Sequence, residues 1–177
     1  MKGGKRITLT EEGSIWDADY PGLGVKIARR NTDDEVIVIV RGIERRRIFR
    51  SDADRALFLD RLADWAVESR AGLYAWALMP NHAHLLVRTG QLPLSRRMQA
   101  WLSVYGTAFN RRLRRSGYLY QHRFKSTLVE EDPHVHRLLA YIHLNPVRWR
   151  LAVTLDALDR YPWTGHAVLL GNHTYPA

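Results

Sequence analysis

Two apolar, strand-like runs separated by only two residues set the strongest constraint on the fold. The runs are Leu73–Met79 and His82–Arg88, and the dipeptide between them, Pro80-Asn81, is a turn signal. Two strands joined by so short a connection can pair only in the antiparallel direction. The sequence therefore predicts a β-hairpin near the middle of the chain.

Strand and helix patterns alternate around this hairpin. In chain order we expect a strand at 36–41, a helix from Ser51 or Asp52 to about Arg70, the hairpin, a helix over about 94–115, a strand from about Phe124, and a helix from Asp132-Pro133 to near Pro146. The last helix is expected to end there because a proline disfavours helical geometry in the residue before it. The order predicts one α+β domain, a βαββαβ antiparallel sheet with helices on one face.

The chain is basic, and its charges are unevenly distributed. It carries 27 Lys and Arg against 18 Asp and Glu, a net charge of +9. No acidic residue lies between Glu68 and Glu130, although that interval is rich in arginine. One interpretation is a solvated basic face. We favour polyanion binding, because ordinary surfaces mix the two signs and arginine suits bidentate phosphate contacts and stacking on bases.

Composition excludes several classes of protein. The absence of cysteine excludes a disulfide scaffold, a thiol nucleophile and a thiolate metal site. The longest aliphatic run, Val36–Val40, is far shorter than the ~20 residues of a membrane helix, and no apolar signal segment follows the basic N-terminus. Neither an acidic cluster for a two-metal nuclease nor a glycine-rich phosphate loop is present. We expect a soluble, intracellular protein with no membrane partner.

His82 and His84 lie on the return strand of the predicted hairpin. Side chains alternate between the faces of a strand, so both imidazoles should project from one face while Ala83 points into the core. Two imidazoles on one face are a common beginning of a metal site. The alternative is a pair of surface histidines on a sheet edge.

A second polar group lies on the last predicted helix, where His134, Arg137, Tyr141 and Asn145 share a stripe. Asn145 offers an amide oxygen as a metal ligand, and Tyr141 offers a phenol that can act as a covalent nucleophile. The alternatives are a helix-capping asparagine and an interface tyrosine. A free phenol has a pKa near 10, so some neighbour must lower it or accept the proton. Arg137, His134 and Lys125 are the candidates.

Three segments resemble the signature blocks of the REP-associated tyrosine transposases, which are single-tyrosine HUH transposases related to insertion-sequence enzymes. The segments are LMPNHAHLLV (78–87), GYLYQHRFKSTLVEED (117–132) and YIHLNPVR (141–148). Weaker similarities occur at 38–49 and 161–163. The resemblance covers roughly residues 36–163 and keeps the order and spacing of the blocks.

The resemblance implies a ferredoxin-like fold with a C-terminal catalytic helix, and cleavage and joining of single-stranded DNA. His82 and His84 match the paired histidines that hold the metal, Mg²⁺ or Mn²⁺, and Asn145 matches a third ligand. Tyr141 matches the nucleophile, which forms a 5′-phosphotyrosine and frees a 3′-hydroxyl. Family substrates are repetitive extragenic palindromes or similar hairpin-forming DNA.

Contacts with DNA are expected from the basic interval. The candidates are Arg111, Arg112, Arg114 and Arg115 at the end of the long helix, and Arg123 and Lys125 in the second block, nearer the site. For the helix-end arginines, an alternative or additional role is to complement the helix dipole. Tyr118 and Tyr120 are candidates either for base stacking or for core packing.

Two features depart from the family pattern. The last block usually continues with a small residue and glycine, where this chain has Trp149 and Arg150, and a charged insert (29–35) precedes the first strand. We expect neither departure to touch the predicted chemistry, although both bear on substrate identity. The chain is divided into an irregular N-terminal arm (1–35), an HUH transposase-like catalytic domain (36–165) and a C-terminal tail (166–177).

Together these features predict a DNA transposase, a metal-dependent single-strand endonuclease that acts on single-stranded or hairpin DNA through Tyr141. It is expected in the bacterial cytoplasm, associated with the nucleoid, as a monomer or homodimer. One alternative is a domesticated hairpin-DNA-binding protein without turnover. Another is a zinc-dependent hydrolase of a small phosphoester, with water as the nucleophile. Replacement of Tyr141 by phenylalanine distinguishes the three.

Overall fold

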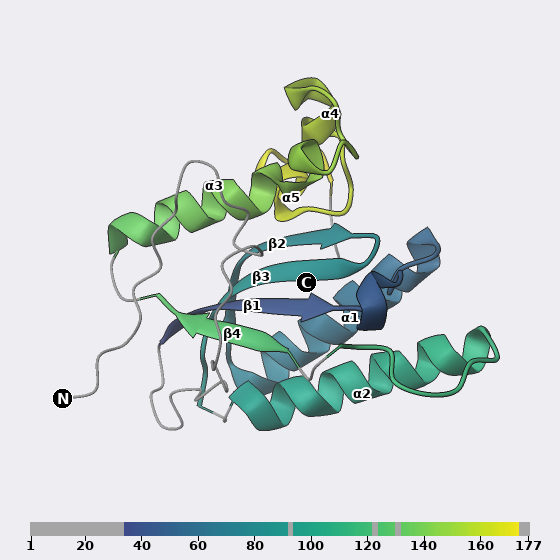
Figure 1. Cartoon of the computed structure of the whole chain (residues 1–177). Helices are drawn as coiled ribbons and strands as arrows, with labels where there is room; N and C mark the ends of the chain where they lie inside the picture. The colour runs from purple at the N-terminus through teal and green to yellow at the C-terminus, as the bar shows by residue number, and fades with distance from the viewer. Residues whose placement is uncertain (1–33, 92–93, 122–123, 130–131, 174–177) are drawn as a thin grey trace.

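A four-stranded antiparallel sheet forms the middle layer of the molecule (Figure 1). The computed structural model describes residues 34–91, 94–121, 124–129 and 132–173. The strands lie in the order β2-β3-β1-β4, with bounds β1 Glu35–Arg41, β2 Gly72–Met79, β3 His82–Arg88 and β4 Lys125–Leu128. All neighbouring strands are antiparallel, and the predicted hairpin is β2–β3.

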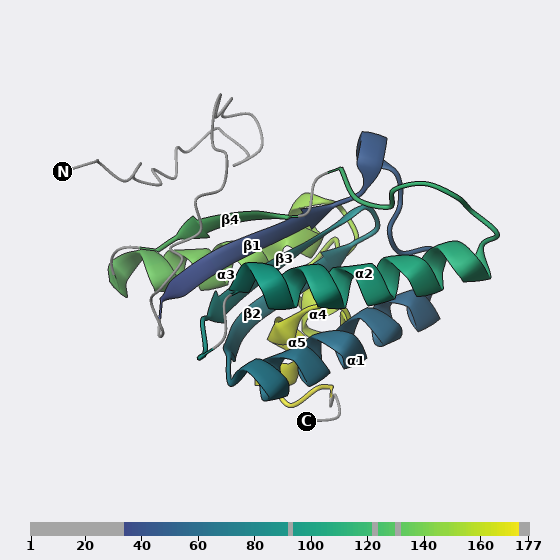
Figure 2. The ribbon, with the colours of Figure 1, turned by 90° about the horizontal axis from the view of Figure 1, so that it is seen from below.

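Helices cover both faces of this sheet. Helices α1 (Asp52–Ser69) and α2 (Leu94–Arg112) lie side by side on one face, and α3 (Asp132–Arg148) crosses the other (Figure 2). The short elements are η1 (Ile43–Arg45), α4 (Leu155–Asp159) and α5 (Gly165–Leu169). The α+β fold is as predicted: a βαββαβ sheet with two helices on one face, followed by a C-terminal helix. Helix α5 occupies part of the segment expected as a tail, and the predicted arm lies outside the described residues up to position 33.

Burial of the sheet on both faces explains the continuous apolar run in β1. Val38 and Val40 pack in the core beneath α1 and α2, whereas Ile37 and Ile39 pack in the core beneath α3. A strand covered on both sides has no polar face, so its sequence does not alternate. This second core is what holds α3 against the sheet.

Helices α1, α2 and α3 are each followed, within two residues of their last position, by an arginine in the left-handed conformation. The φ angles are 53° at Arg70, 50° at Arg114 and 54° at Arg150. In α1, for example, the Arg70 and Ala71 amides bond back to the carbonyls of the last turn, the Schellman pattern that usually has glycine at this position. The nearest glycines, Gly72 and Gly117, lie beyond these arginines. Helix α2 therefore ends at Arg112 rather than near Arg115.

Pro146 lies inside α3, so the expectation that the helix ends before it is wrong. A proline in a helix leaves the carbonyl four residues earlier, here that of Ile142, without its N–H partner. The side-chain amide of Asn145 compensates: Nδ2 donates to the Tyr141 carbonyl at 3.0 Å and lies 3.4 Å from the Ile142 carbonyl. The helix continues to Arg148.

The segment 161–164 covers the outer edge of β2. The Leu78 amide donates to the Trp163 carbonyl at 2.9 Å, and the Tyr161 hydroxyl donates to the Leu78 carbonyl at 3.2 Å. An exposed edge strand can pair with another chain, and this segment shields part of the β2 edge from such pairing. The similarity at 161–163 thus has a structural explanation.

Candidate active site

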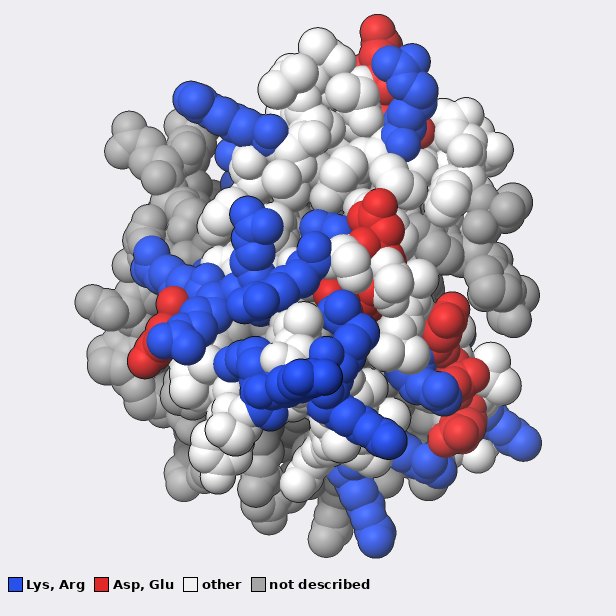
Figure 3. Space-filling view, turned by 90° about the vertical axis from the view of Figure 1, so that its right-hand side faces the viewer, with Lys and Arg blue, Asp and Glu red and all other residues white. Residues whose placement is uncertain are grey.

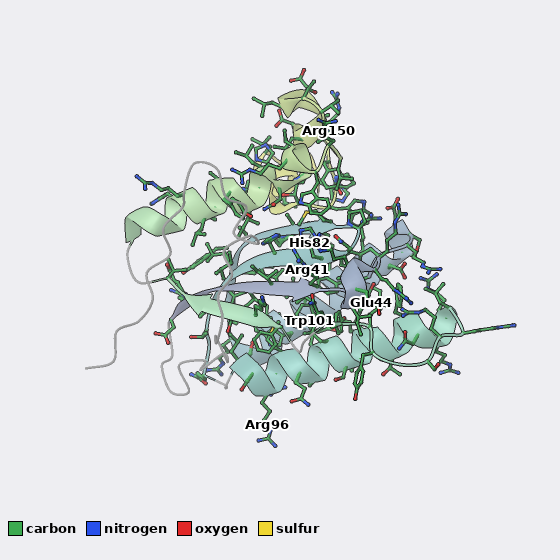
Figure 4. All side chains as sticks on the ribbon, viewed as in Figure 1. Arg41, Glu44, His82, Arg96, Trp101 and Arg150 are labelled. Carbon is green, nitrogen blue, oxygen red and sulfur yellow. The ribbon has the colours of Figure 1, made fainter. Side chains whose placement is uncertain are left out.

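His82 and His84 both face α3, from the start of β3. Both are fully buried, and their ring centroids lie 5.0 Å apart. Ala83, between them, packs in the opposite core, so the alternation predicted for this strand is confirmed. In the sheet His82 lies opposite Arg41, and His84 lies opposite Ile39. Figure 4 shows His82 and Arg41 close together at this end of the sheet.

Both imidazoles are neutral at physiological pH. Burial, aided by the charge of Arg41, lowers the pKa of His82 to about 3. Burial also lowers the pKa of His84 well below its usual value, and His82 and Arg41 add to the effect. A neutral imidazole, with a lone pair on one nitrogen, is the form that binds a metal ion.

Asn81 orients the His82 ring, a role the sequence analysis missed. The His82 Nδ1 lies 2.7 Å from the Asn81 Oδ1, and the Asn81 Nδ2 donates to the Arg45 carbonyl at 3.1 Å. A carboxamide oxygen only accepts hydrogen bonds, so Nδ1 carries the proton and the lone pair is on Nε2. Asn81 thus selects the tautomer in which Nε2 can act as a ligand.

Helix α3 places Tyr141 against the histidine pair. The Tyr141 ring meets that of His84 edge-on at a centroid distance of 5.8 Å, and the residue is only 7% exposed. The Arg148 guanidinium lies over the same ring, 4.8 Å from its centroid. Burial raises the pKa of Tyr141, and the charges of Arg148 and Arg41 oppose this rise.

Arg148 is therefore a cation in direct contact with the Tyr141 ring, and it was not among the residues predicted for this role. Of the residues that were predicted, Arg137 is exposed, and the side chain of His134 lies outside the described part of the chain. Arg148 follows Tyr141 at a spacing of seven residues, which returns to the same helix face after two turns. That spacing was the available signal, but the predicted helix end near Pro146 concealed it.

Asn145 lies one turn after Tyr141 and is 1% exposed. At Trp149, the residue just past the end of α3, the ring lies 4.9 Å from that of His82. Asn145 is thus between two residues of the same face that both contact the histidine pair. Its amide nitrogen is bonded to the helix backbone, so the carboxamide oxygen is the atom that can accept a hydrogen bond or bind a cation.

Trp149 contradicts the expectation that the departures from the family pattern leave the site untouched. Its indole is tilted by 57° against the His82 ring and remains 44% exposed. It forms the open side of a ring cluster whose other members are His82, His84 and Tyr141. Trp149, which directly follows the last residue of α3, comes within reach because the helix continues through Pro146.

The donor set fits a divalent cation that also takes oxygen ligands from a substrate. Two neutral imidazoles and one amide oxygen carry no net charge and leave coordination positions open. Within the described residues, no group of three or more His, Cys, Asp or Glu side chains could hold a metal ion. A cation here would therefore depend on the amide of Asn145 and on groups that arrive with the substrate.

Arginines surround the end of the sheet that carries His82. Figure 3 shows Lys and Arg side chains gathered on the face where, in Figure 1, η1 and the end of α2 lie. We call this surface the basic end: Arg45, Arg46, Arg47 and Arg50 from the segment after β1, with Arg111, Arg112, Arg114 and Arg115 from the end of α2. The four arginines after β1 were not predicted, because acidic residues lie close to them in the sequence and they fall outside the interval that lacks acidic residues.

Backbone contacts join the two halves of the basic end. The Ile43 amide donates to the Leu119 carbonyl at 3.0 Å, and the Gln121 amide donates to the Arg41 carbonyl at 3.0 Å. Gly42 is required at this junction, since a Cβ there would collide with the Arg46 carbonyl oxygen. The basic end is thus held directly beside Arg41 and the histidine pair.

Not every arginine of the basic end is equally available to a ligand. Arg112 forms an ion pair with Asp54, a buried carboxylate at the start of α1, and Arg46 pairs with Glu44 at 2.8 Å. Arg112 therefore has a structural role, because it ties the end of α2 to the start of α1. This is a different structural role from the helix-dipole alternative considered for this group.

The remaining sequence candidates are placed as follows. Lys125 of β4 is exposed. It lies opposite Ile39 of β1, and Ile39 lies opposite His84 of β3, so Lys125 and His84 are on the same face of the sheet, the face covered by α3, with β1 between them. Arg123 lies outside the described residues. Tyr118 is 84% exposed, whereas Tyr120 packs against the core beneath α1 and α2. Of the two tyrosines, the structure leaves Tyr118 open to a base.

Comparisons with known proteins agree with the fold. A family model described as IS200-like transposase matches residues 34–145. A REP-associated tyrosine transposase bound to a REP hairpin superposes with a TM-score of 0.63 at 17% identity, over 84% of this chain and 87% of that one. A Deinococcus radiodurans protein assigned as a transposase matches at 20% identity over 66% of this chain and 95% of that one, with a TM-score of 0.46. No curated protein matches. Among the described residues, no helix has the length and apolar character needed to cross a membrane.

Proposed function

The chain belongs to the IS200-like transposase family of DNA-cleaving enzymes, and on that premise we propose that it cleaves and rejoins single-stranded DNA beside a hairpin through Tyr141. The observation that carries this proposal is the position of the phenol. It lies against His84, 5.8 Å between ring centroids, and beneath the Arg148 guanidinium. The proposed nucleophile thus lies beside a candidate metal ligand and a cation, at one end of the sheet.

The basic end supports a nucleic-acid substrate. Its arginines adjoin Arg41, which lies opposite His82, so a strand bound to them would reach the histidine pair. Arginine-rich surfaces bind the phosphate backbone. The REP-associated transposase that shares the fold is bound to a REP hairpin, which makes a hairpin with an unpaired flank the substrate class to test first.

The proposed cleavage is a transesterification. The Tyr141 oxygen attacks the scissile phosphorus, the bond from phosphorus to the 3′ oxygen breaks, and the 5′ phosphate remains on the tyrosine. The phenol gives up one proton and the departing 3′ oxygen takes one up, so the charges balance. Arg148 and Arg41 favour the phenolate electrostatically. Rejoining is the same exchange with an incoming 3′-hydroxyl.

His82, His84 and Asn145 would hold a divalent cation, Mg²⁺ or Mn²⁺, which would polarise the phosphoryl group and neutralise charge that develops on it. Asn81 keeps the proton on Nδ1 of His82, so that Nε2 is available as a ligand. Tyr141 and His84 of the same chain are in contact, and we therefore propose that one chain contains a complete site.

The test is a denaturing gel with end-labelled hairpin DNA and Mn²⁺. A DNA band of reduced mobility is expected with the wild type and with Tyr118→Phe, the matched control at an exposed tyrosine, but not with Tyr141→Phe. Since burial raises the pKa of Tyr141, the yield in a fixed time should rise as the pH is increased above neutrality.

The other outcomes identify the rival functions. Binding without any covalent band, across hairpins from the source genome, would indicate a binding protein without turnover. Cleavage that persists in Tyr141→Phe would mean that water is the nucleophile and would refute the proposal.

A further inference from the structure

Trp149 presents an exposed aromatic surface directly beside the histidine pair. Ring centroids link it to the proposed nucleophile in a chain of contacts: 4.9 Å from Trp149 to His82, 5.0 Å from His82 to His84 and 5.8 Å from His84 to Tyr141. Since 44% of Trp149 remains exposed, a large part of the indole is open to a ligand.

The backbone around Trp149 is held in one conformation by the end of α3. The Trp149 amide donates to the Asn145 carbonyl at 3.0 Å, and the Leu151 amide donates to the Pro146 carbonyl at 2.8 Å. Arg150 adopts the left-handed conformation that closes this Schellman motif. A platform held in this way costs a ligand little ordering of the protein when it binds.

Cations flank the indole on both sides in the sequence. Arg148 lies over the Tyr141 ring, and Arg150 is exposed. Aromatic side chains interleaved with cations are the usual means by which proteins bind unpaired nucleotides, because the base stacks on the ring and the phosphate meets the charge. The ligand chemistry that fits this surface is therefore a nucleotide of a single strand.

We propose that Trp149 stacks on the unpaired base next to the scissile phosphate and so positions the strand for attack by Tyr141. This inference rests on the proposed function. Trp149 is a positioning residue in this account, since the indole takes no part in bond making. A competing role is that Trp149 only packs on His82 and supports the metal ligand.

The two roles predict different results for an abasic probe. The probe is a synthetic DNA hairpin with unpaired flanks, together with a series in which one flanking nucleotide at a time is abasic. Binding is measured by fluorescence anisotropy in the Tyr141→Phe background, where no covalent product forms. If Trp149 stacks on a base, Trp149→Ala should weaken binding of the intact probe roughly 5- to 100-fold. It should have no effect on the probe that lacks the contacted base.

Three further measurements complete the test. Trp149→Phe should restore most of the affinity, and Val153→Ala, an exposed control four residues along the chain, should bind as tightly as the parent. Mn²⁺ affinity should be unchanged in Trp149→Ala. In the cleavage assay with Tyr141 present, Trp149→Ala should both raise KM and lower kcat for the intact probe, and it should change neither constant for the probe that lacks the contacted base.

Each contrary outcome has a distinct meaning. Equal weakening by Trp149→Ala on intact and abasic probes, or a fall in Mn²⁺ affinity that accounts for the loss, would overturn the stacking role and leave the proposed function standing. Absence of any DNA complex with the parent protein would overturn both.

Discussion

Replacing Asn81 by alanine should weaken Mn²⁺ binding by about 10- to 100-fold, the usual effect of removing the partner that orients a histidine ligand. The Asn81 Oδ1 lies 2.7 Å from Nδ1 of a fully buried His82, and within the described contacts it is what assigns the proton to that nitrogen. Without it the proton can move to Nε2, the nitrogen proposed to bind the metal. A tenfold loss corresponds to about 1.4 kcal/mol, within the range for losing one buried hydrogen bond.

The assay is a titration with Mn²⁺ near neutral pH, followed by calorimetry or by the electron paramagnetic resonance of the free ion. Asn81→Asp keeps an oxygen acceptor beside Nδ1 and should bind Mn²⁺ at least as tightly as the wild type. Asn110→Ala is the matched control, because Asn110 also donates to a backbone carbonyl, that of Gly117 at 2.9 Å, but lies on α2.

Two results would refute this reasoning. Wild-type affinity in a folded Asn81→Ala protein would show that the tautomer is set by something else. Equal losses in Asn81→Ala and Asn81→Asp would indicate distortion of the loop, which Asn81 also holds through the Arg45 carbonyl.

Four more outcomes are expected. Asp54→Ala should lower the free energy of unfolding by about 2–4 kcal/mol in urea titrations, because the buried Asp54 carboxylate accepts hydrogen bonds from the Arg50 and Ser51 amides and pairs with Arg112. Asp60→Ala, at an exposed position of the same helix, should change the free energy of unfolding little. Burial lowers the pKa of His143 to about 4, so the unfolded chain binds the proton first as the pH is decreased from about 6.5 to 4, and the free energy of unfolding should fall by up to about 3 kcal/mol over this range. His143→Gln should flatten that pH dependence, and an unchanged dependence would refute the assignment. Arg70→Gly should raise the unfolding free energy by about 0.5–1 kcal/mol, since glycine adopts the φ of 53° without strain; a loss of stability would show that the arginine side chain matters more. Arg114→Ala should make the log–log salt dependence of single-strand binding shallower by about 0.7, and an unaltered slope would remove Arg114 from the DNA contacts.

Local patterns were sufficient to predict the order of elements and the common face of His82 and His84. Period-two alternation assigns both histidines to one side of β3 whatever the sheet packs against, and the helical spacing of Tyr141 and Asn145 likewise depends only on α3 being a helix. The match to the family blocks then connected these two sets of residues across the chain. These predictions rest on geometry within a single element.

The features that periodicity did not reveal depend on contacts between elements or on the energetics of a helix end. Helix α3 continues past Pro146, where the Asn145 amide lies within 3.4 Å of the freed Ile142 carbonyl, and this continuation brings Arg148 over Tyr141 and Trp149 against His82. The basic end forms because the segment after β1 meets the segment after α2, residues far apart in the chain. A one-dimensional pattern records which face a residue occupies, whereas the partner it meets there is determined by how the elements pack.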